Sequence, residues 1–193
     1  GNILLRYDTP YAVSWGVVSD IAVGEDIIIL RSDGTVHRWN AEQAEMEPVS
    51  GLSGITAISA GESHYLALDG EGRVWSWGVN EYGQLGDGTS VDRDTPQIIS
   101  GLSGASSIKA GSTWSLAIAD SSLYGWGRNY AGCLGKAWNE KFLTPILLGN
   151  GGTLGGEAPV LLATIEYGSI IHTESGYLYG FVTNDYLGNL PIT

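Results

Sequence analysis

ITAISAGESHYLALDGEGRVWSWGVNEYGQLGDGTSVDRDTPQIISGLSG, residues 55–104, is the stretch that decides the fold, because most of it recurs along the chain. A second copy starts at Ala105 with ASSIKAGSTWSLAIADSSLYGWGRNYAGCLG and reaches another Thr-Pro pair at Thr144 and Pro145. Two fainter copies follow Asp20 (DIAVGEDIIILRSDGTVHRW) and Thr164 (TIEYGSIIHTESGYLYGF). Such self-similarity predicts four successive copies of one structural unit.

Three landmarks recur in these copies. The first is a glycine that opens an apolar run, at Gly24, Gly61, Gly111 and Gly168. The second is an aromatic residue that ends the next run, at Trp39, Trp77, Trp126 and Phe181. The third is a proline that starts another extended segment, at Pro10, Pro48, Pro96 and Pro145. We expect the aromatic residues to pack between neighbouring units.

The best copy shows how one unit folds. Its apolar run Tyr65–Leu68 is followed by Asp69–Gly72, whose glycines suit a hairpin turn, and the chain then returns through Arg73–Trp77. We expect Asn80 to adopt a left-handed turn, and Pro96 to lie on an edge strand because it lacks an N–H group. Each unit is thus predicted to be a small antiparallel sheet. Such a sheet cannot bury both of its faces alone, so the units must stack.

The pattern Ala-Gly-x-x-His-x-Leu-Ala-Leu, Trp-Gly-x-Asn-x-x-Gly-Gln-Leu-Gly and Thr-Pro resembles the RCC1 (regulator of chromosome condensation) repeat. It is complete in residues 58–96, good in 108–145, degenerate in 20–48, where Gly-Gln-Leu-Gly is missing, and partial in 164–193. The resemblance implies an all-β propeller of four-stranded blades, usually seven in a closed ring. We interpret residues 1–193 as a single RCC1-like domain. Its units are placed at 11–54, 55–104, 105–160 and 161–193, with 1–10 completing the last.

Four units are too few for a seven-bladed ring, and two interpretations remain. In one, the N-terminal segment supplies the outer strand of the last unit and closes a ring, within one chain or as a homodimer. Backbone hydrogen bonds would then join residues 3–6 to a strand within 177–193. In the other, the chain is a fragment of a longer array. The first is slightly favoured, because the lengths of the two ends are nearly complementary.

Composition narrows the function classes. The net charge is −12 with only 9 Lys and Arg residues, which argues against nucleic acid, whose phosphates need clustered positive charge. The single cysteine, Cys133, excludes an internal disulfide and a cysteine-based zinc site. No apolar run approaches the roughly 18 residues of a membrane span. We predict no metal, no cofactor and no membrane span.

Catalytic residues are not predicted. The three histidines, His37, His64 and His172, fall in different units, and no nucleophile elbow, zinc-binding helix or phosphate loop occurs. His64 is the histidine of the repeat itself and is expected to make structural hydrogen bonds. Trp114 stands at its position in the next unit and is expected to fill the core. The protein is therefore predicted not to be an enzyme.

Four aromatic residues are the candidate protein-binding positions. Trp138 lies in a polar connection without a counterpart in the other units, so it is either a loop anchor or an exposed binding residue. Tyr82, Tyr130 and Tyr186 occupy one equivalent turn position in three units. In a ring they would lie on one face, where they would either form a rim for recognition or stack on the next unit's turn.

The preferred hypothesis is a non-enzymatic binding or scaffold module that contacts a protein partner through a propeller face. RCC1-like proteins also serve as nucleotide exchange factors, but that role acts with chromatin and fits the acidic charge poorly. The alternative is a carbohydrate-binding protein or an inhibitor of secreted enzymes on a bacterial surface. For either hypothesis, a bacterial extracellular or cell-surface location is favoured over the cytoplasm.

Overall fold

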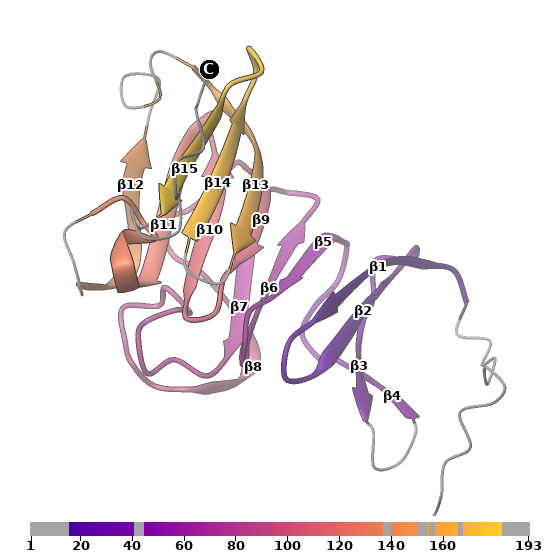
Figure 1. Cartoon of the computed structure of the whole chain (residues 1–193). Coiled ribbons are helices and arrows are strands. Elements are labelled where there is room, and N and C mark those ends of the chain that lie inside the picture. The colour runs from indigo at the N-terminus through magenta and orange to yellow at the C-terminus, as the bar shows by residue number, and fades with distance from the viewer. Residues whose placement is uncertain are drawn as a thin grey trace, which may run out of the picture.

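Four antiparallel β-sheets make up the computed structural model, which describes residues 16–40, 45–136, 140–149, 154, 157–165 and 168–182 (Figure 1). Each sheet is a meander, in which strands that are consecutive in sequence are also hydrogen-bonded neighbours. We call the sheets units 1 to 4 in chain order. The all-β prediction is confirmed: the helical structure in the described ranges is one 3-10 turn, η1 (Tyr130–Gly132).

The strands have the following bounds. Unit 1 contains β1 (Val18–Val23), β2 (Ile27–Arg31), β3 (Val36–Asn40) and β4 (Glu45–Pro48). Unit 2 contains β5 (Ile55–Ala60), β6 (His64–Asp69), β7 (Val74–Gly78) and β8 (Arg93–Ile98). Unit 3 contains β9 (Ala105–Ala110), β10 (Trp114–Ala119), β11 (Ser122–Arg128) and β12 (Lys141–Gly149). Unit 4 contains β13 (Pro159–Ile165), β14 (Gly168–Thr173) and β15 (Leu178–Val182).

Prolines mark the outer edge of the sheets in units 1, 2 and 3, as predicted. Pro48, Pro96 and Pro145 lie in β4, β8 and β12, each of which is the last strand of its sheet and has a partner on one side only. A residue without an N–H group is tolerated there because one side of the strand makes no ladder hydrogen bonds. Pro10 lies outside the described residues.

The turn between β6 and β7 shows how one unit is joined to the next. The carboxylate of Asp69 accepts hydrogen bonds from the backbone N–H groups of Glu71 and Arg73, both at 3.0 Å. Gly72 has a φ of +75°, which a residue with a side chain adopts only with strain. Its carbonyl accepts a hydrogen bond of 3.0 Å from the N–H of Ala105, the first residue of unit 3. The hairpin turn therefore also connects two units.

The first strands of the four units surround a common axis. They border a hollow of about 400 Å³ that is lined by residues of every unit. A Cβ atom on Gly24 would overlap the carbonyl oxygen of Gly61, and one on Gly61 would overlap the carbonyl oxygen of Gly111. These landmark positions need glycine because the backbones of neighbouring units meet there.

Gly168 opens β14 but does not correspond to the other landmark glycines, which corrects the sequence alignment. The residue after it, Ser169, faces Phe181 in the same register in which Ser115 faces Trp126. Gly168 therefore corresponds to Trp114, the residue before Ser115 in unit 3. Trp114 lies three positions after the landmark glycine of unit 3, Gly111. Matching glycines by identity missed this shift, because strand register is set by pairing with neighbouring strands.

The core consists of three apolar layers, one between each pair of consecutive units. Trp77 packs with residues of unit 1, Trp126 with residues of unit 2, and Phe181 with residues of unit 3. Trp126 is completely buried and Trp77 is 6% exposed. The prediction that these aromatic residues pack between units is confirmed for the three junctions that the structure describes.

A hydrogen-bond chain crosses the junction of units 2 and 3. The Ser115 hydroxyl donates to the carbonyl of Gln84 at 2.9 Å, so its oxygen is free to accept from Nε2 of His64, also at 2.9 Å. The next junction repeats the arrangement: the indole N–H of Trp114 donates to Ser169, at 3.2 Å. Both ring-bearing residues are buried, so the structural roles predicted for His64 and Trp114 are confirmed.

Asn80 stabilises the connection between β7 and β8 by a different mechanism from the one predicted. It is not among the residues with positive φ, whereas Gly83 and Gly86 are. Instead its side chain is fully buried, accepts a hydrogen bond from the N–H of Leu85 and donates to the carbonyls of Thr89 and Val91. Backbone groups in this irregular segment have no strand partners for their hydrogen bonds. A side-chain amide can replace those partners because it both accepts and donates hydrogen bonds.

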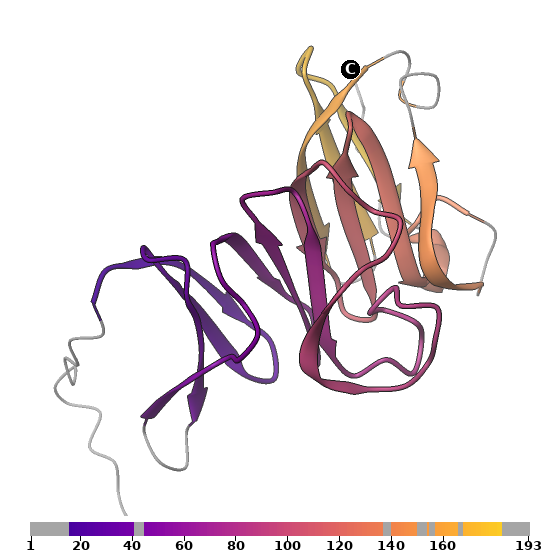
Figure 2. The ribbon, with the colours of Figure 1, turned by 180° about the vertical axis from the view of Figure 1, so that it is seen from behind.

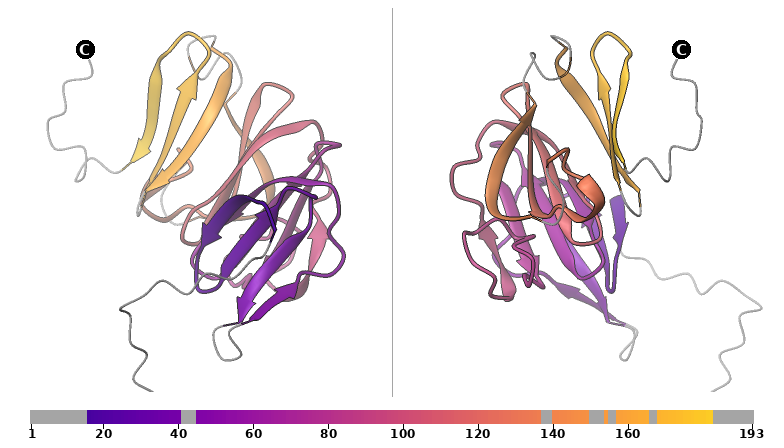
Figure 3. Two further views of the ribbon diagram at one scale, coloured as in Figure 1. Left: turned by 90° about the vertical axis from the view of Figure 1, so that its right-hand side faces the viewer. Right: turned by 60° about the vertical axis from the view of Figure 1, so that its left-hand side comes forward.

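The described units form an arc with two uncovered ends (Figures 2 and 3). At the unit 1 end, Ile21 is 56% exposed, and at the unit 4 end, Leu161 is 62% exposed and Leu178 64%. The predicted outer strand from residues 1–10 and its partners beyond residue 182 lie outside the described residues, so closure by the N-terminus stays a prediction, as does the homodimer.

Candidate protein-binding site

The structure brings together two of the predicted tyrosines around one arginine. Arg128 is the last residue of β11, and its guanidinium carbon lies 4.5 Å from the ring centre of Tyr82 and 5.0 Å from that of Tyr130. Tyr82 belongs to unit 2 and the other two residues to unit 3. A guanidinium group at these distances is attracted to the negative faces of both rings. We call these three residues the tyrosine–arginine cluster.

Local turns set the positions of the two rings. The N–H of Tyr82 donates to Oε1 of Gln84 at 2.9 Å, which holds the turn just before Gly83. Tyr130 begins the 3-10 turn that follows β11, and Ala131 within that turn has a φ of +57°. Tyr82 contacts the neighbouring unit through Arg128, which is the packing role considered for it. Tyr130 remains 42% exposed, so the cluster also presents an aromatic ring to solvent.

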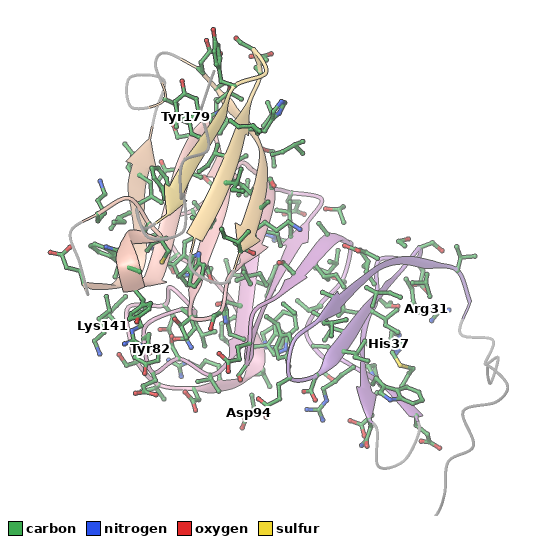
Figure 4. All side chains as sticks on the ribbon, viewed as in Figure 1. Arg31, His37, Tyr82, Asp94, Lys141 and Tyr179 are labelled. Carbon is green, nitrogen blue, oxygen red and sulfur yellow. The ribbon has the colours of Figure 1, made fainter. Side chains whose placement is uncertain are left out.

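The cluster carries positive charge on an acidic protein. Lys141, the first residue of β12, pairs in register with Arg128 and is labelled with Tyr82 in Figure 4. In the described ranges, neither Arg128 nor Lys141 makes an ion pair, whereas Arg31, Arg38, Arg73 and Arg93 all do. Because no described carboxylate pairs with them, these two cations are available for an external acidic group.

The remaining candidate positions, Trp138 and Tyr186, lie outside the described residues. Arg128 was not predicted as a site residue. Its signal is the sequence Trp-Gly-Arg-Asn-Tyr at 126–130, where unit 2 has Val79 in place of the arginine. One residue type at one position could not show that two rings from different units would enclose it.

Three groups with catalytic potential, Cys133, His64 and Asp69, are buried. Burial raises the pKa of the Cys133 thiol to about 12, so it is not ionised at neutral pH. Burial lowers the pKa of His64 to about 4, so its imidazole is neutral. The carboxylate of Asp69 is occupied by Arg73 Nε at 2.7 Å and by the indole N–H of Trp75 at 2.9 Å.

The described ranges show neither a cluster of metal ligands nor a helix that could span a membrane. They contain no group of three or more His, Cys, Asp or Glu side chains placed to hold a metal ion. No helix there has the length and apolar character needed to cross a membrane.

Comparisons with known proteins identify the repeat. The family model of the regulator of chromosome condensation (RCC1) repeat matches residues 71–118, and a second model with the same description matches residues 55–84. E3 ubiquitin-protein ligase HERC2 of Mus musculus is 33% identical over 188 residues, which cover 90% of this chain and 4% of HERC2.

Two solved structures share the fold. Human WBSCR16 gives a TM-score of 0.74 at 18% identity, with 84% of this chain and 46% of that chain covered. Prp20p from Saccharomyces cerevisiae gives 0.72 at 21% identity, with 88% and 46% covered. This chain thus spans under half of either protein and a small part of HERC2. These comparisons give no support to the alternative of carbohydrate binding.

The repeat matches, the likeness to HERC2 and the four stacked antiparallel sheets agree with one another. The chain belongs to the RCC1-repeat family, with the β-propeller type of fold.

Proposed function

We propose that this chain is a non-enzymatic protein-binding module, and that the tyrosine–arginine cluster is one of its contact surfaces. The observation that carries the proposal is Arg128, which lies between two tyrosine rings and makes no ion pair with a described carboxylate. Tyrosine and arginine are the side chains that, with tryptophan, dominate binding energy at protein interfaces. Both rings and the guanidinium group are held in place before binding, so little side-chain entropy is lost.

The chemistry of the cluster favours an acidic partner surface. Arg128 can bind a carboxylate with two parallel hydrogen bonds, and Lys141 adds a second positive charge on the neighbouring strand. The partner would place this carboxylate against the guanidinium edge and an apolar side chain against Tyr130. The overall charge of −12 then selects against acidic proteins that lack this geometry.

The fold relatives support a binding role. The yeast structure of Prp20p is described together with its binding properties to Gsp1p and histones, and another structure contains Kap60 bound to yeast RCC1 (Prp20). These are properties of Prp20p, and they support protein binding as the activity of the present chain. The ligase activity in the name of HERC2 belongs to a protein of which this chain matches 4%, and we assign no catalysis to this chain.

A photo-crosslinking experiment tests the cluster. A benzophenone amino acid is placed at position 82, the protein is irradiated in a lysate of its source cells, and the captured protein is identified and purified. We expect the double substitution Tyr82→Ala and Tyr130→Ala to weaken binding of that purified protein about 10- to 100-fold, as for hot-spot residues. Titration by biolayer interferometry measures the change.

Tyr177→Ala is the matched control, because Tyr177 is 61% exposed and lies in unit 4, away from the cluster. Arg128→Lys retains the charge and loses the planar group, so it should weaken binding almost as much as Arg128→Ala. Unchanged affinity in the double variant would show that the cluster is an internal contact between units and not a binding surface.

A further inference from the structure

The junction of units 2 and 3 is filled by the loop between β7 and β8. The carbonyl of Gln84 in this loop accepts a hydrogen bond of 2.8 Å from the indole N–H of Trp126. Gly86 packs on the same ring so closely that a Cβ atom there would lie 2.9 Å from it. The N–H of Gly88 donates to the carbonyl of Leu143 in β12, at 2.8 Å. The Gly-Gln-Leu-Gly segment thus covers Trp126 completely.

The junction of units 1 and 2 has a groove of about 520 Å³ at the equivalent place. Trp77, Gly78, Asp94 and Thr95 line this groove. Strand register makes them the counterparts of the four unit 3 residues that the loop contacts, namely Trp126, Gly127, Leu143 and Thr144. We call it the unit 1–2 groove.

Unit 1 is too short to supply the covering loop. Eight residues separate Trp39 from Pro48, whereas eighteen separate Trp77 from Pro96 and eighteen separate Trp126 from Pro145. The deficit of ten residues includes the whole Gly-Gln-Leu-Gly segment. The groove is therefore a site shaped for a loop that this unit does not have.

Trp77 has an unused hydrogen-bond donor at this site. Its side chain is 6% exposed, yet its indole N–H makes no hydrogen bond to any described residue. The indole N–H groups of Trp75, Trp114 and Trp126 all have acceptors. The Trp77 nitrogen is not among the buried polar atoms that lack a partner, so its N–H faces the solvent of the groove. The equivalent N–H of Trp126, one junction further on, donates to the carbonyl of Gln84.

The charge of the groove defines its occupant. Five carboxylates line it, from Glu25, Asp26, Glu47, Asp92 and Asp94, against two guanidinium groups, from Arg38 and Arg93. Arg38 is bonded to Asp26 and Glu47, and Arg93 is bonded to Asp87, which lies outside the lining. Glu25, Asp92 and Asp94 therefore remain without a positive partner among the described residues, with Asp94 at the junction in Figure 4.

We propose that the unit 1–2 groove binds an extended, basic segment of a partner protein in place of the missing loop. A backbone carbonyl of the segment accepts the hydrogen bond from Trp77, and a glycine or another small residue lies on the indole face, as Gly86 does on Trp126. Basic side chains on either side pair with Asp92 and Asp94. The groove shares no residue with the tyrosine–arginine cluster, so either proposal can fail while the other stands.

Two labelled hexapeptides test the proposal by fluorescence anisotropy with the full chain. Lys-Gly-Gln-Leu-Gly-Lys carries the loop motif between positive charges, and Glu-Gly-Gln-Leu-Gly-Glu carries it between negative ones. We expect the lysine peptide to bind at least about tenfold more tightly, with a difference that shrinks as salt is added. The proposal would be overturned by equal affinity for both peptides, or by no binding of either peptide at about 1 mM. A dissociation constant of that size corresponds to a binding free energy of only about −4 kcal/mol.

Substitutions locate the binding. The double variant Asp92→Asn and Asp94→Asn retains the oxygen of Asp92 that accepts from the N–H of Asn80, at 2.7 Å, and removes only the charge. It should lose most of the preference for the lysine peptide. The control, Glu140→Gln with Glu174→Gln, removes two exposed charges outside the groove and should retain it.

Trp77→Phe removes the N–H donor and keeps an aromatic ring. It should weaken the lysine peptide about 3- to 10-fold, which is the effect of one hydrogen bond, provided that its melting curve shows a folded protein. The groove variants also test whether a second copy of the chain, and not a partner peptide, occupies the groove. A dimer that Asp92→Asn and Asp94→Asn dissociate, in a protein that binds neither peptide, would replace the peptide proposal.

Discussion

Replacing Trp126 by alanine should lower the free energy of unfolding by about 4 to 5 kcal/mol, at the upper end for a large aromatic residue lost from a core. The ring is fully buried between units 2 and 3, donates to the carbonyl of Gln84 and is covered by Gly86. Its removal leaves a cavity at a contact between two units, so the loss spreads to both. Chemical denaturation of the purified chain measures the effect.

Trp77→Ala is the matched comparison, since Trp77 occupies the same place in unit 2. It should cost less, about 3 kcal/mol, because the ring borders a groove and its N–H makes no hydrogen bond to a described residue. Trp126→Phe should cost about 1 to 2 kcal/mol by removing the hydrogen bond and part of the ring. If Trp77→Ala were the more damaging of the two alanine variants, the covering loop would not stabilise the indole beneath it.

Acidification should destabilise the protein by about 3 kcal/mol between pH 7 and pH 4 through His64 alone. Burial lowers the pKa of His64 from 6.5 to about 4 in the folded chain. In the unfolded chain the pKa returns to about 6.5, so the unfolded state binds the additional proton between these two values. Stability due to the neutral imidazole is therefore fully present above pH 6.5, and it is lost as the pH falls toward 4.

Carboxylates affect the stability of the fold at lower pH than His64 does, so the two effects can be separated. Hydrogen bonds from Trp75 and Arg73 outweigh burial and lower the pKa of Asp69, and Thr89 and Arg93 do the same for Asp87. Stability from these groups is lost only as the pH falls below the usual range of an aspartate.

His64→Gln keeps a donor for Ser115 and removes the titration. Denaturation at a series of pH values should show a much flatter dependence between pH 6.5 and pH 4 in this variant. His37→Gln, at a partly buried position in unit 1, is the matched histidine substitution to be measured beside it. A parent curve that is already flat in this window would show that His64 remains accessible to protons.

Features that depend on local chain chemistry could be predicted from the sequence. The hairpin at Asp69–Gly72 follows from glycines at a turn between two apolar runs, and the edge positions of Pro96 and Pro145 follow from the missing N–H group. Because unit 2 repeats in unit 3, stacked sheets with Trp77 and Trp126 between them were also predictable. Each of these rules acts over a few residues or over one repeat.

Contacts between units were decided by the tertiary structure alone. The place of Arg128 depends on a ring from another unit, and the groove over Trp77 depends on a loop that unit 1 lacks. The partners in such contacts lie about one repeat apart in sequence, so no local pattern records them. The sequence by itself determined the units and their order, whereas packing between units determined the surfaces available for binding, because those surfaces form only where two units meet.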